Sequence, residues 1–104
     1  MLYDVNRVVL VGRLTSDPNV MMAGQTSKCV FSLAVNRPKG KDGKENGVDF
    51  LRVISFASLA DKAMELSKGQ SVVVIGKVNT GSYEKNGQKV YTTDFVADCI
   101  GTVI

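Results

Sequence analysis

Residues 49–56 of this chain, DFLRVISF, form a short, mainly apolar segment that predicts a β-strand. Side chains of a strand project to its two sides in turn, so Phe50, Arg52 and Phe56 share one side. A continuous apolar run is also typical of a strand buried on both sides, but burying an unpaired guanidinium is costly, and Arg52 argues against that alternative. Two aromatic rings and a cation on one open face can stack bases and hold a phosphodiester chain. This strand is therefore the first candidate for a functional surface.

The same alternation predicts four further short strands. They are residues 5–14, 28–36, 72–78 and 91–100. In the second of these segments Phe31 alternates with other apolar residues, which indicates a core position and not a surface for bases. Residues 15–18, which include a proline, and the pair Gly24-Gln25 indicate turns. Asn86-Gly87 is the strongest hairpin signal in the chain.

One helix is predicted directly after Phe56. Ser58 can cap its first turn, with Asp61 three residues later, and Gly69 can end it. Apolar residues recur at positions 59, 63 and 66, which is the spacing of one helix face. We expect this helix to cover the core and to have a structural role.

The order of elements is three strands, one helix and two strands, without the alternating βαβ units of a parallel α/β sheet. This order predicts an all-β fold, a five-stranded Greek-key OB-fold barrel with one α-helix between strands 3 and 4. A chain of 104 residues is long enough for one core, so we expect a single domain over residues 1–104. In such barrels the face of strands 2 and 3 and the loops joining strands 1–2 and 4–5 bind oligonucleotides or oligosaccharides.

The composition narrows the class of function. The chain is 44 % hydrophobic and 22 % charged, as globular domains are, and its net charge of +3 favours a polyanionic partner only weakly. It contains no histidine, so no Ser/His/Asp or Cys/His catalytic arrangement can be built, and its acidic residues are scattered. We therefore expect no enzymatic activity, no metal site and no cofactor.

The cysteines and the N-terminus bear on the compartment. Cys29 and Cys99 form no CxxC pair and are expected to be buried thiols in a reducing environment. Asp4 and Arg7 interrupt any apolar stretch that a signal peptide would need, and no apolar run approaches the length of a transmembrane helix. These features predict a cytoplasmic protein without membrane contact.

The segment of residues 37–44 is a candidate for contact with a polyanion. It carries Arg37, Lys39 and Lys41, with glycines and a proline, directly before the strand that holds the two Phe residues. Such a loop could close over a bound backbone, since basic grooves follow phosphates. The structural alternative is a loop whose charges are simply solvated.

Two other groups of candidates have structural alternatives as well. Arg7 and Arg13 fall on the same alternate positions of the first strand, where they could face a ligand or merely keep an exposed strand soluble. Tyr83 lies on one arm of the predicted hairpin among lysines. It could offer a stacking surface, or it could cover the apolar face of its own hairpin.

Several segments in order along the chain resemble the bacterial single-stranded DNA-binding proteins (SSB). They are residues 6–15 (NRVVLVGRLT), 17–18 (DP), 31–37 (FSLAVNR), 50–56 (FLRVISF), 59–60 (LA), 68–69 (KG) and 91–93 (YTT). The resemblance implies an OB-fold that forms a homo-oligomer, usually a tetramer, and wraps single-stranded DNA without sequence preference. It also implies two sets of contacts. The base-stacking aromatics would be Phe50, Phe56 and Tyr83, and the phosphate-contacting cations Arg7, Arg13 and Arg52.

The chain departs from the pattern of that family in three ways. The family often has tryptophan at the positions of Phe50 and Tyr83, and this chain has none, so weaker stacking is expected at each site. A family aromatic expected just after Asn36-Arg37 is replaced by Pro38 or Lys39, which shifts weight from stacking to charge. The flexible linker and acidic tail of typical members are not present, so we expect no tail-mediated protein partners.

The function predicted from these features is sequence-independent binding and protection of single-stranded DNA in replication, recombination or repair. The alternative is an SSB-like replication or primosome adaptor that acts mainly through protein–protein contacts. An oligosaccharide-binding or enzymatic OB domain is disfavoured, because the predicted binding face carries arginines and lysines in place of neutral polar side chains. Oligomerisation is assigned to the apolar run at residues 8–11, on the strength of the resemblance.

Overall fold

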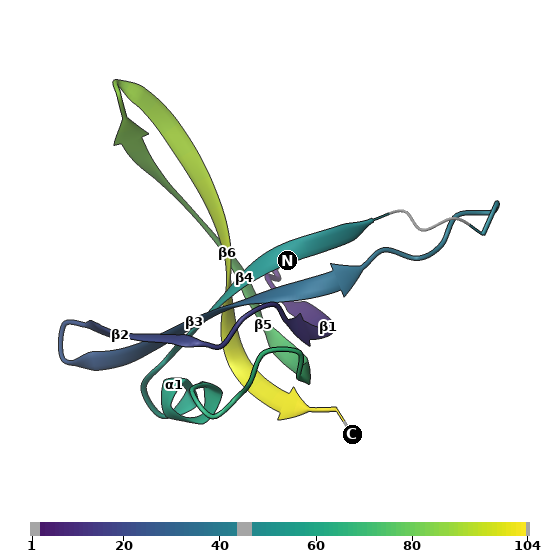
Figure 1. The fold of residues 1–104 in the computed structure, drawn as a ribbon. Coiled ribbons are helices and arrows are strands. Elements are labelled where there is room, and N and C mark those ends of the chain that lie inside the picture. Colours follow the sequence, from purple (N-terminus) through teal and green to yellow (C-terminus); the bar gives the residue numbers. More distant parts are fainter. Residues whose placement is uncertain (1–2, 44–46, 104) are drawn as a thin grey trace.

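The computed structural model describes residues 3–43 and 47–103 of the chain (Figure 1). It contains one short helix and several strands, some of them long and strongly bent. In chain order the elements are β1 (Val8–Leu14), β2 (Asn19–Ala23), β3 (Thr26–Asn36), β4 (Val48–Phe56), α1 (Ala57–Ala63), β5 (Ser71–Lys85) and β6 (Gln88–Thr102). The predicted all-β class with a single helix is confirmed.

Five of these strands close into a ring. The sheet order is β1-β5-β6-β4-β3, and β1 also pairs with β3 through Arg13–Ala34 and Leu14–Leu33, which closes the barrel. All of these pairings are antiparallel except that of β4 with β6. Among the strands of the ring, α1 lies between the third and the fourth along the chain, so the predicted OB-fold barrel is confirmed.

The strand β2 was not predicted, since the predicted turns at residues 15–18 and 24–25 only flank it. It pairs with β3 only and lies outside the ring. All five of its side chains are exposed, so no buried alternation marks it in the sequence. Its backbone pairing with the first half of β3 holds it in place, from Asn19–Val30 to Ala23–Thr26.

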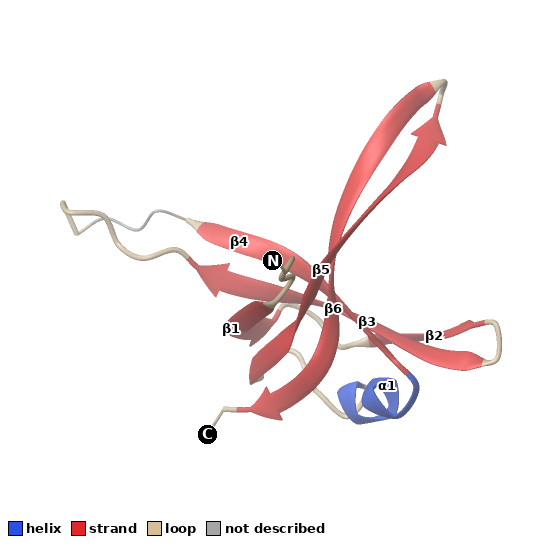
Figure 2. Ribbon diagram, turned by 180° about the vertical axis from the view of Figure 1, so that it is seen from behind, coloured by secondary structure: helices blue, strands red, loops and turns tan. Residues whose placement is uncertain are grey.

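The core lies inside the ring and beneath α1, which covers one end of the barrel (Figure 2). Phe31 is only 2 % exposed, which confirms its predicted core position. Ala60 and Ala63 bring the apolar face of α1 into this core, with Leu59 partly buried beside them, and Leu66 follows from the turn after the helix. The helix thus has the structural role expected from its spacing.

The helix is shorter than predicted and begins differently. Its N-cap is Phe56, not Ser58, and no side chain caps it. It ends at Ala63, so Gly69 does not terminate it. Gly69 instead adopts a φ of +85° in the following turn, and its N–H donates a hydrogen bond of 2.8 Å to the carbonyl oxygen of Leu14. This bond ties the turn before β5 to the end of β1.

The predicted strands at 72–78 and 91–100 are parts of a much longer hairpin. β5 and β6 remain paired up to Lys85–Gln88, beyond the barrel, and their ribbon projects as an arm (Figure 2). Most side chains of the projecting part are exposed and polar, so no core signal in the sequence shows its length. A register shift at Ile75–Gly76 marks a bulge where the ribbon bends.

The two cysteines differ in environment. Cys29 lies fully buried in the core, and burial raises the pKa of its thiol. Cys99 is exposed, contrary to the prediction of a buried thiol. The physical reason is its position, since Cys99 pairs with Ile75 on the outward side of the β5–β6 ribbon.

Candidate nucleic-acid interface

The outward face of β3 and β4 carries the two predicted aromatic residues. Cross-strand pairs place Ala34 beside Phe50 and Lys28 beside Phe56. Phe50 is 69 % exposed and Phe56 is 42 % exposed, so both rings reach solvent from one strand face. Between them lie Arg52, opposite Ser32, and Ile54, opposite Val30. We call this outward face of residues 28–34 and 50–56 the β3–β4 platform.

Two residues with small side chains occupy the β3 part of the platform. Ser32 and Ala34 have little bulk, so the ring of Phe50 and the side chain of Arg52 stand above their β3 neighbours. Ile54 is only 7 % exposed although it belongs to the outward alternation. The floor between the two rings is therefore partly apolar, which suits flat bases.

Arg52 is exposed at the centre of the platform. Its side chain is 54 % exposed, and its Nε atom lies 3.7 Å from Oδ1 of Asp94 on β6. An exposed ion pair of this length contributes little to stability, and the remaining guanidinium donors stay open to a phosphate. The structure therefore places this candidate where its chemistry is usable.

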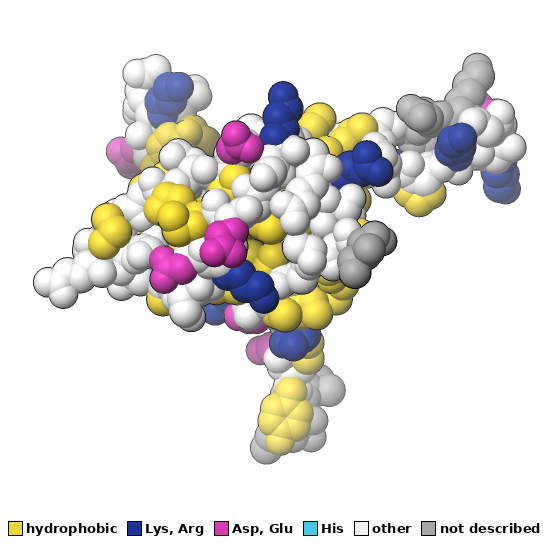
Figure 3. Space-filling view, turned by 60° about the horizontal axis from the view of Figure 1, so that its bottom comes forward, with side chains coloured by type: hydrophobic (Ala, Val, Ile, Leu, Met, Phe, Trp, Pro, Cys, Tyr) yellow, Lys and Arg dark blue, Asp and Glu magenta, His cyan; other side chains and the backbone are white. Residues whose placement is uncertain are grey.

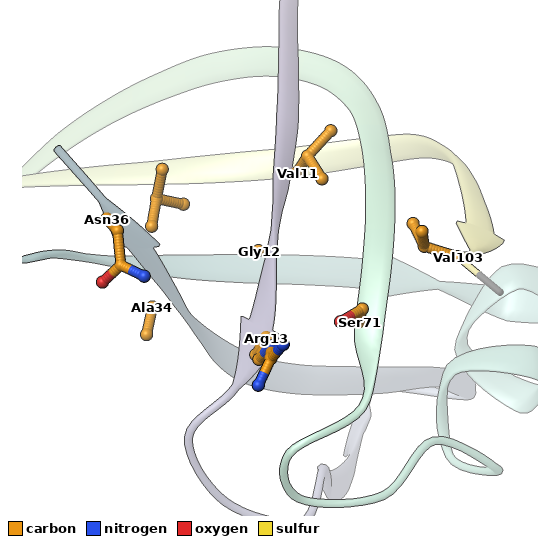
Figure 4. A pocket seen from close by; sticks show the side chains of 8 residues that line it. Val11, Gly12, Arg13, Ala34, Asn36, Ser71 and Val103 are labelled. Carbon is orange, nitrogen blue, oxygen red and sulfur yellow. The ribbon is translucent and has the colours of Figure 1, made fainter. Parts of the chain in front are cut away.

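Arg13 joins the platform across β3. It pairs with Ala34, whose other neighbour is Phe50, so these residues form one row over β1, β3 and β4. Adjacent strands are about 4.8 Å apart, which puts the backbones of β1 and β4 roughly 10 Å apart along this row. A hollow of about 320 Å³ lies here, with Arg13 between Ala34 of β3 and Ser71 of β5 (Figure 4).

Arg7 lies elsewhere. Asn6 exchanges two hydrogen bonds with the backbone of Val78, of 2.7 and 2.9 Å, and β1 pairing starts at Val8–Gly76. Arg7 is therefore held beside β5, and β5 is separated from β4 by β6. The structure does not bring Arg7 and Arg13 to the same part of the surface, although both stand on the same alternate positions.

Arg37 is held by a carboxylate. Its Nη2 and Nε atoms donate to the same oxygen, Oδ1 of Asp49, at 2.7 and 3.1 Å. The hydrogen bond from Arg37 lowers the pKa of Asp49, and the same bond raises the pKa of Arg37. Asp49 alternates with Phe50 along β4, so this pair lies on the other side of the β3–β4 hairpin from the two rings.

Two further cations of the 37–44 loop lie within the described residues. Lys39 and Lys41 are exposed, and Lys39 lines a small hollow of about 140 Å³ with Arg37 and Gly47. Lys44, the last residue of the predicted basic segment, lies outside the described residues. The described part of this loop projects from the end of the hairpin at which β3 leads into β4, well away from α1 (Figure 1).

Tyr83 extends the outward surface along the β5–β6 arm. It is 52 % exposed and pairs with Val90, which shares its side of the ribbon with Asp94, the partner of Arg52. Tyr83 thus lies on the side of the ribbon that continues the platform. Half of its surface is covered, as the alternative of hairpin packing expects, and half is free for stacking.

Tyr91 is an exposed aromatic that sequence reasoning did not select. It is 75 % exposed, and Nζ of Lys89 lies 5.4 Å from the centre of its ring. Its partner is Ser82, so Tyr91 and Tyr83 lie on opposite sides of the ribbon. The alternation of lysine, valine and tyrosine at 89–91 could have indicated this position, had the strand been predicted to start before residue 91.

The end of the barrel that bears α1 has a different character. On the face shown in Figure 3, acidic and basic side chains are interspersed, with no concentration of cations. Within the described ranges 3–43 and 47–103, no group of three or more His, Cys, Asp or Glu residues could hold a metal ion. The single helix of that part of the chain has 7 residues, so it is too short to cross a membrane.

The fold and this surface define a small OB-fold domain with an outward face of aromatic rings and cations. Comparison with known proteins then identifies its family. Residues 5–103 match the Single-strand binding protein family, so the chain belongs to that family. The resemblance predicted from the sequence motifs is confirmed.

Individual relatives support the same assignment. A single-stranded DNA-binding protein of Clostridium tetani is 44 % identical over 98 residues, which cover 90 % of this chain and 67 % of the relative. One of Clostridium perfringens is 41 % identical over 98 residues, covering 90 % and 63 %. Single-stranded DNA-binding protein 1 of Staphylococcus aureus MSSA476 is 41 % identical over 99 residues, covering 92 % and 64 %. The chain spans about two thirds of the length of these relatives.

Proposed function

We propose that this protein binds single-stranded DNA without sequence preference and protects it during replication, recombination or repair. The observation that carries the proposal is the pair of exposed rings, Phe50 and Phe56, on one face of β4 with Arg52 between them. The names of the relatives point to the same ligand. The activity is binding alone, without catalysis or a cofactor, and it takes place in the cytoplasm.

Stacking supplies the part of the affinity that resists salt. Each base that stacks on an aromatic side chain contributes about 1–3 kcal/mol, and every base offers a π-face, so the contact is tolerant of sequence. Phe50, Phe56 and Tyr83 are the stacking residues of the proposal, because each is exposed and each lies on the outward side that includes the platform.

Cations supply the part that depends on salt. Arg52 and Arg13 bind phosphates on the platform, and Lys39 and Lys41 bind them from the β3–β4 loop. Arg37 also contributes, but only if a phosphate replaces Asp49 as its partner, since the two now share a short ion pair. Arg7 lies beside β5, so it contacts DNA only if the bound DNA strand continues around the barrel from the platform.

We further propose that the protein acts as a homotetramer. Val9 and Val11 are 64 % and 55 % exposed on the outward side of β1, next to Ile75 and Val73 of β5. A contiguous apolar surface of this kind is costly in water and is typical of an interaction site. Joining several platforms on one particle raises affinity for a long strand, because later contacts form at high local concentration.

The test is a fluorescence-anisotropy titration of labelled dT oligomers and matched duplex DNA, at low and high salt. The proposal predicts length-dependent binding to single strands that is far tighter than binding to duplex, with part of it surviving high salt. Equal binding to duplex that vanishes with salt would reduce the surface to a generic basic patch. The adaptor alternative would then be favoured, and it predicts a protein partner.

A further inference from the structure

A single row of side chains crosses the Phe56 end of the platform and continues onto β2. The pairs Phe56–Lys28 and Lys28–Met21 place these three residues side by side on β4, β3 and β2. Directly paired residues of adjacent antiparallel strands share a face, with their Cβ atoms about 4.5–5.5 Å apart. Lys28 therefore stands between an aromatic ring and a thioether side chain.

The row Phe56–Lys28–Met21 is open to solvent, and Lys28 in its middle is partly covered. Phe56 is 42 % exposed and Met21 is 37 % exposed, while Lys28 is half-buried. A lysine in such a place packs its methylene stem against its apolar neighbours and keeps its ammonium group in water. The stem is held in position, and the charge is offered at the surface beside the ring.

Lys28 forms no ion pair with a carboxylate in the part of the chain that the structure describes. Among the residues that the structure describes, the ion pairs are Arg37–Asp49 and Arg52–Asp94, and Lys28 belongs to neither. A cation without a protein partner loses no ion pair when it binds a phosphate. At the Phe50 end of the platform Arg13 and Arg52 provide cations, and at the Phe56 end Lys28 provides one.

We propose that Lys28 binds a backbone phosphate next to the base stacked on Phe56, and that Met21 forms the outer wall of that position. The binding surface then continues from β4 across β3 onto β2, the strand outside the ring. This inference rests on the proposed binding of single-stranded DNA. It gives β2, whose side chains are all exposed, a role in holding the ligand.

The test measures the salt dependence of dT binding by Lys28→Gln, which keeps most of the stem and removes the charge. Losing one phosphate contact lowers the slope of log affinity against log salt by about 0.7, which corresponds to an affinity about fivefold lower at 0.1 M salt and nearly unchanged at 1 M. Lys28→Arg should keep the wild-type slope. Met21→Ala should weaken binding at high salt and leave the slope unchanged.

The matched control is Lys62→Gln, which removes one exposed positive charge from the last turn of α1. It should leave the slope at the wild-type value, and thermal unfolding of each variant shows whether the fold is intact. Equal slopes for Lys28→Gln, Lys62→Gln and the wild type, with binding still weakened by Phe56→Ala, would overturn the role of Lys28 and leave the proposed function standing. Failure of the proposed function looks different, because the wild type itself would then not prefer single strands to duplex.

Discussion

Phe50 presents more of its surface to solvent than Phe56, the other aromatic residue of β4, and its replacement by alanine separates DNA contact from folding. The ring is 69 % exposed, so less than a third of it is buried by the protein. Full burial of a Phe side chain is worth about 1.5–3 kcal/mol, so Phe50→Ala should cost only about 0.5–1 kcal/mol of unfolding free energy. The loss of one base stack costs about 1–3 kcal/mol of binding, which is about a 5- to 150-fold loss of affinity per site.

The assay combines anisotropy titration of a labelled dT oligomer at high salt with urea unfolding of the same sample. High salt is chosen because it suppresses the phosphate contacts and leaves stacking as the main source of affinity. Phe31→Ala is the matched control, since Phe31 is only 2 % exposed and its loss should cost about 3–5 kcal/mol of stability by leaving a cavity. It should not lower affinity in the fraction that remains folded.

Two results would refute this reasoning. If Phe50→Ala is destabilised as much as Phe31→Ala, the ring is part of the packing of the protein in solution and the platform is misassigned. If its affinity for dT at high salt equals that of the wild type, stacking on Phe50 does not contribute to binding. A loss of affinity with the stability nearly unchanged is the expected outcome.

Three further predictions concern charge and backbone. Arg52→Ala should lower the salt slope of dT binding by about 0.7, since one phosphate contact is lost, and an unchanged slope would remove Arg52 from the site. Asp49→Asn removes the ion pair between Asp49 and Arg37 and should raise affinity in 0.1 M salt. Asp61→Asn on α1 makes the same change of net charge and should raise affinity less. Equal effects of the two variants would mean that only net charge matters. Gly12→Ala should lower the free energy of unfolding by about 1–3 kcal/mol, because the new Cβ would lie 2.6 Å from the carbonyl oxygen of Ala34. A variant as stable as the wild type in urea would show that β1 and β3 can separate at this position.

Acidification tests the Arg37–Asp49 pair in the wild type. The pKa of Asp49 is lowered by its hydrogen bond to Arg37, so the pair is intact above the ordinary carboxyl pKa and is lost as the pH falls through the lowered value. The contribution of Arg37 to DNA affinity should therefore increase only when the pH falls below the ordinary pKa range of an aspartate. Titration of Asp49 by NMR, in the wild type and in Arg37→Gln, measures the shift directly. An unchanged pKa in that variant would contradict the assigned cause.

The local sequence pattern was sufficient to predict an element where one side of that element faces the core. The alternation of β4 and the core position of Phe31 follow from a two-residue period, because a strand with one buried face must repeat its apolar residues at that interval. The helix after Phe56 was predicted for the same kind of reason, although its start was misplaced by the unused cap at Ser58. The order of three strands, one helix and two strands predicted the OB-fold, the family motifs implied the same fold, and the closed ring of strands bears it out.

The sequence pattern did not predict the segments that are held only by backbone pairing with another strand. β2 and the outer part of the β5–β6 arm bury little, so no apolar period marks them and only hydrogen bonding to a partner strand makes them regular. The exposure of Cys99 has a similar origin, because its side of the ribbon depends on the register shift near Gly76.

The residues of this chain therefore specify on their own which side chains alternate and which segments are apolar, because these properties depend on neighbours two to four positions away. The composition of the interface is decided by the tertiary structure. Barrel closure sets the register of strands far apart in sequence, and this places Arg13 in the row of Phe50 while Asn6 holds Arg7 beside β5. The pairing of β3 with β2 and with β4 places Lys28 between Met21 and Phe56, an arrangement across three strands that no local period encodes.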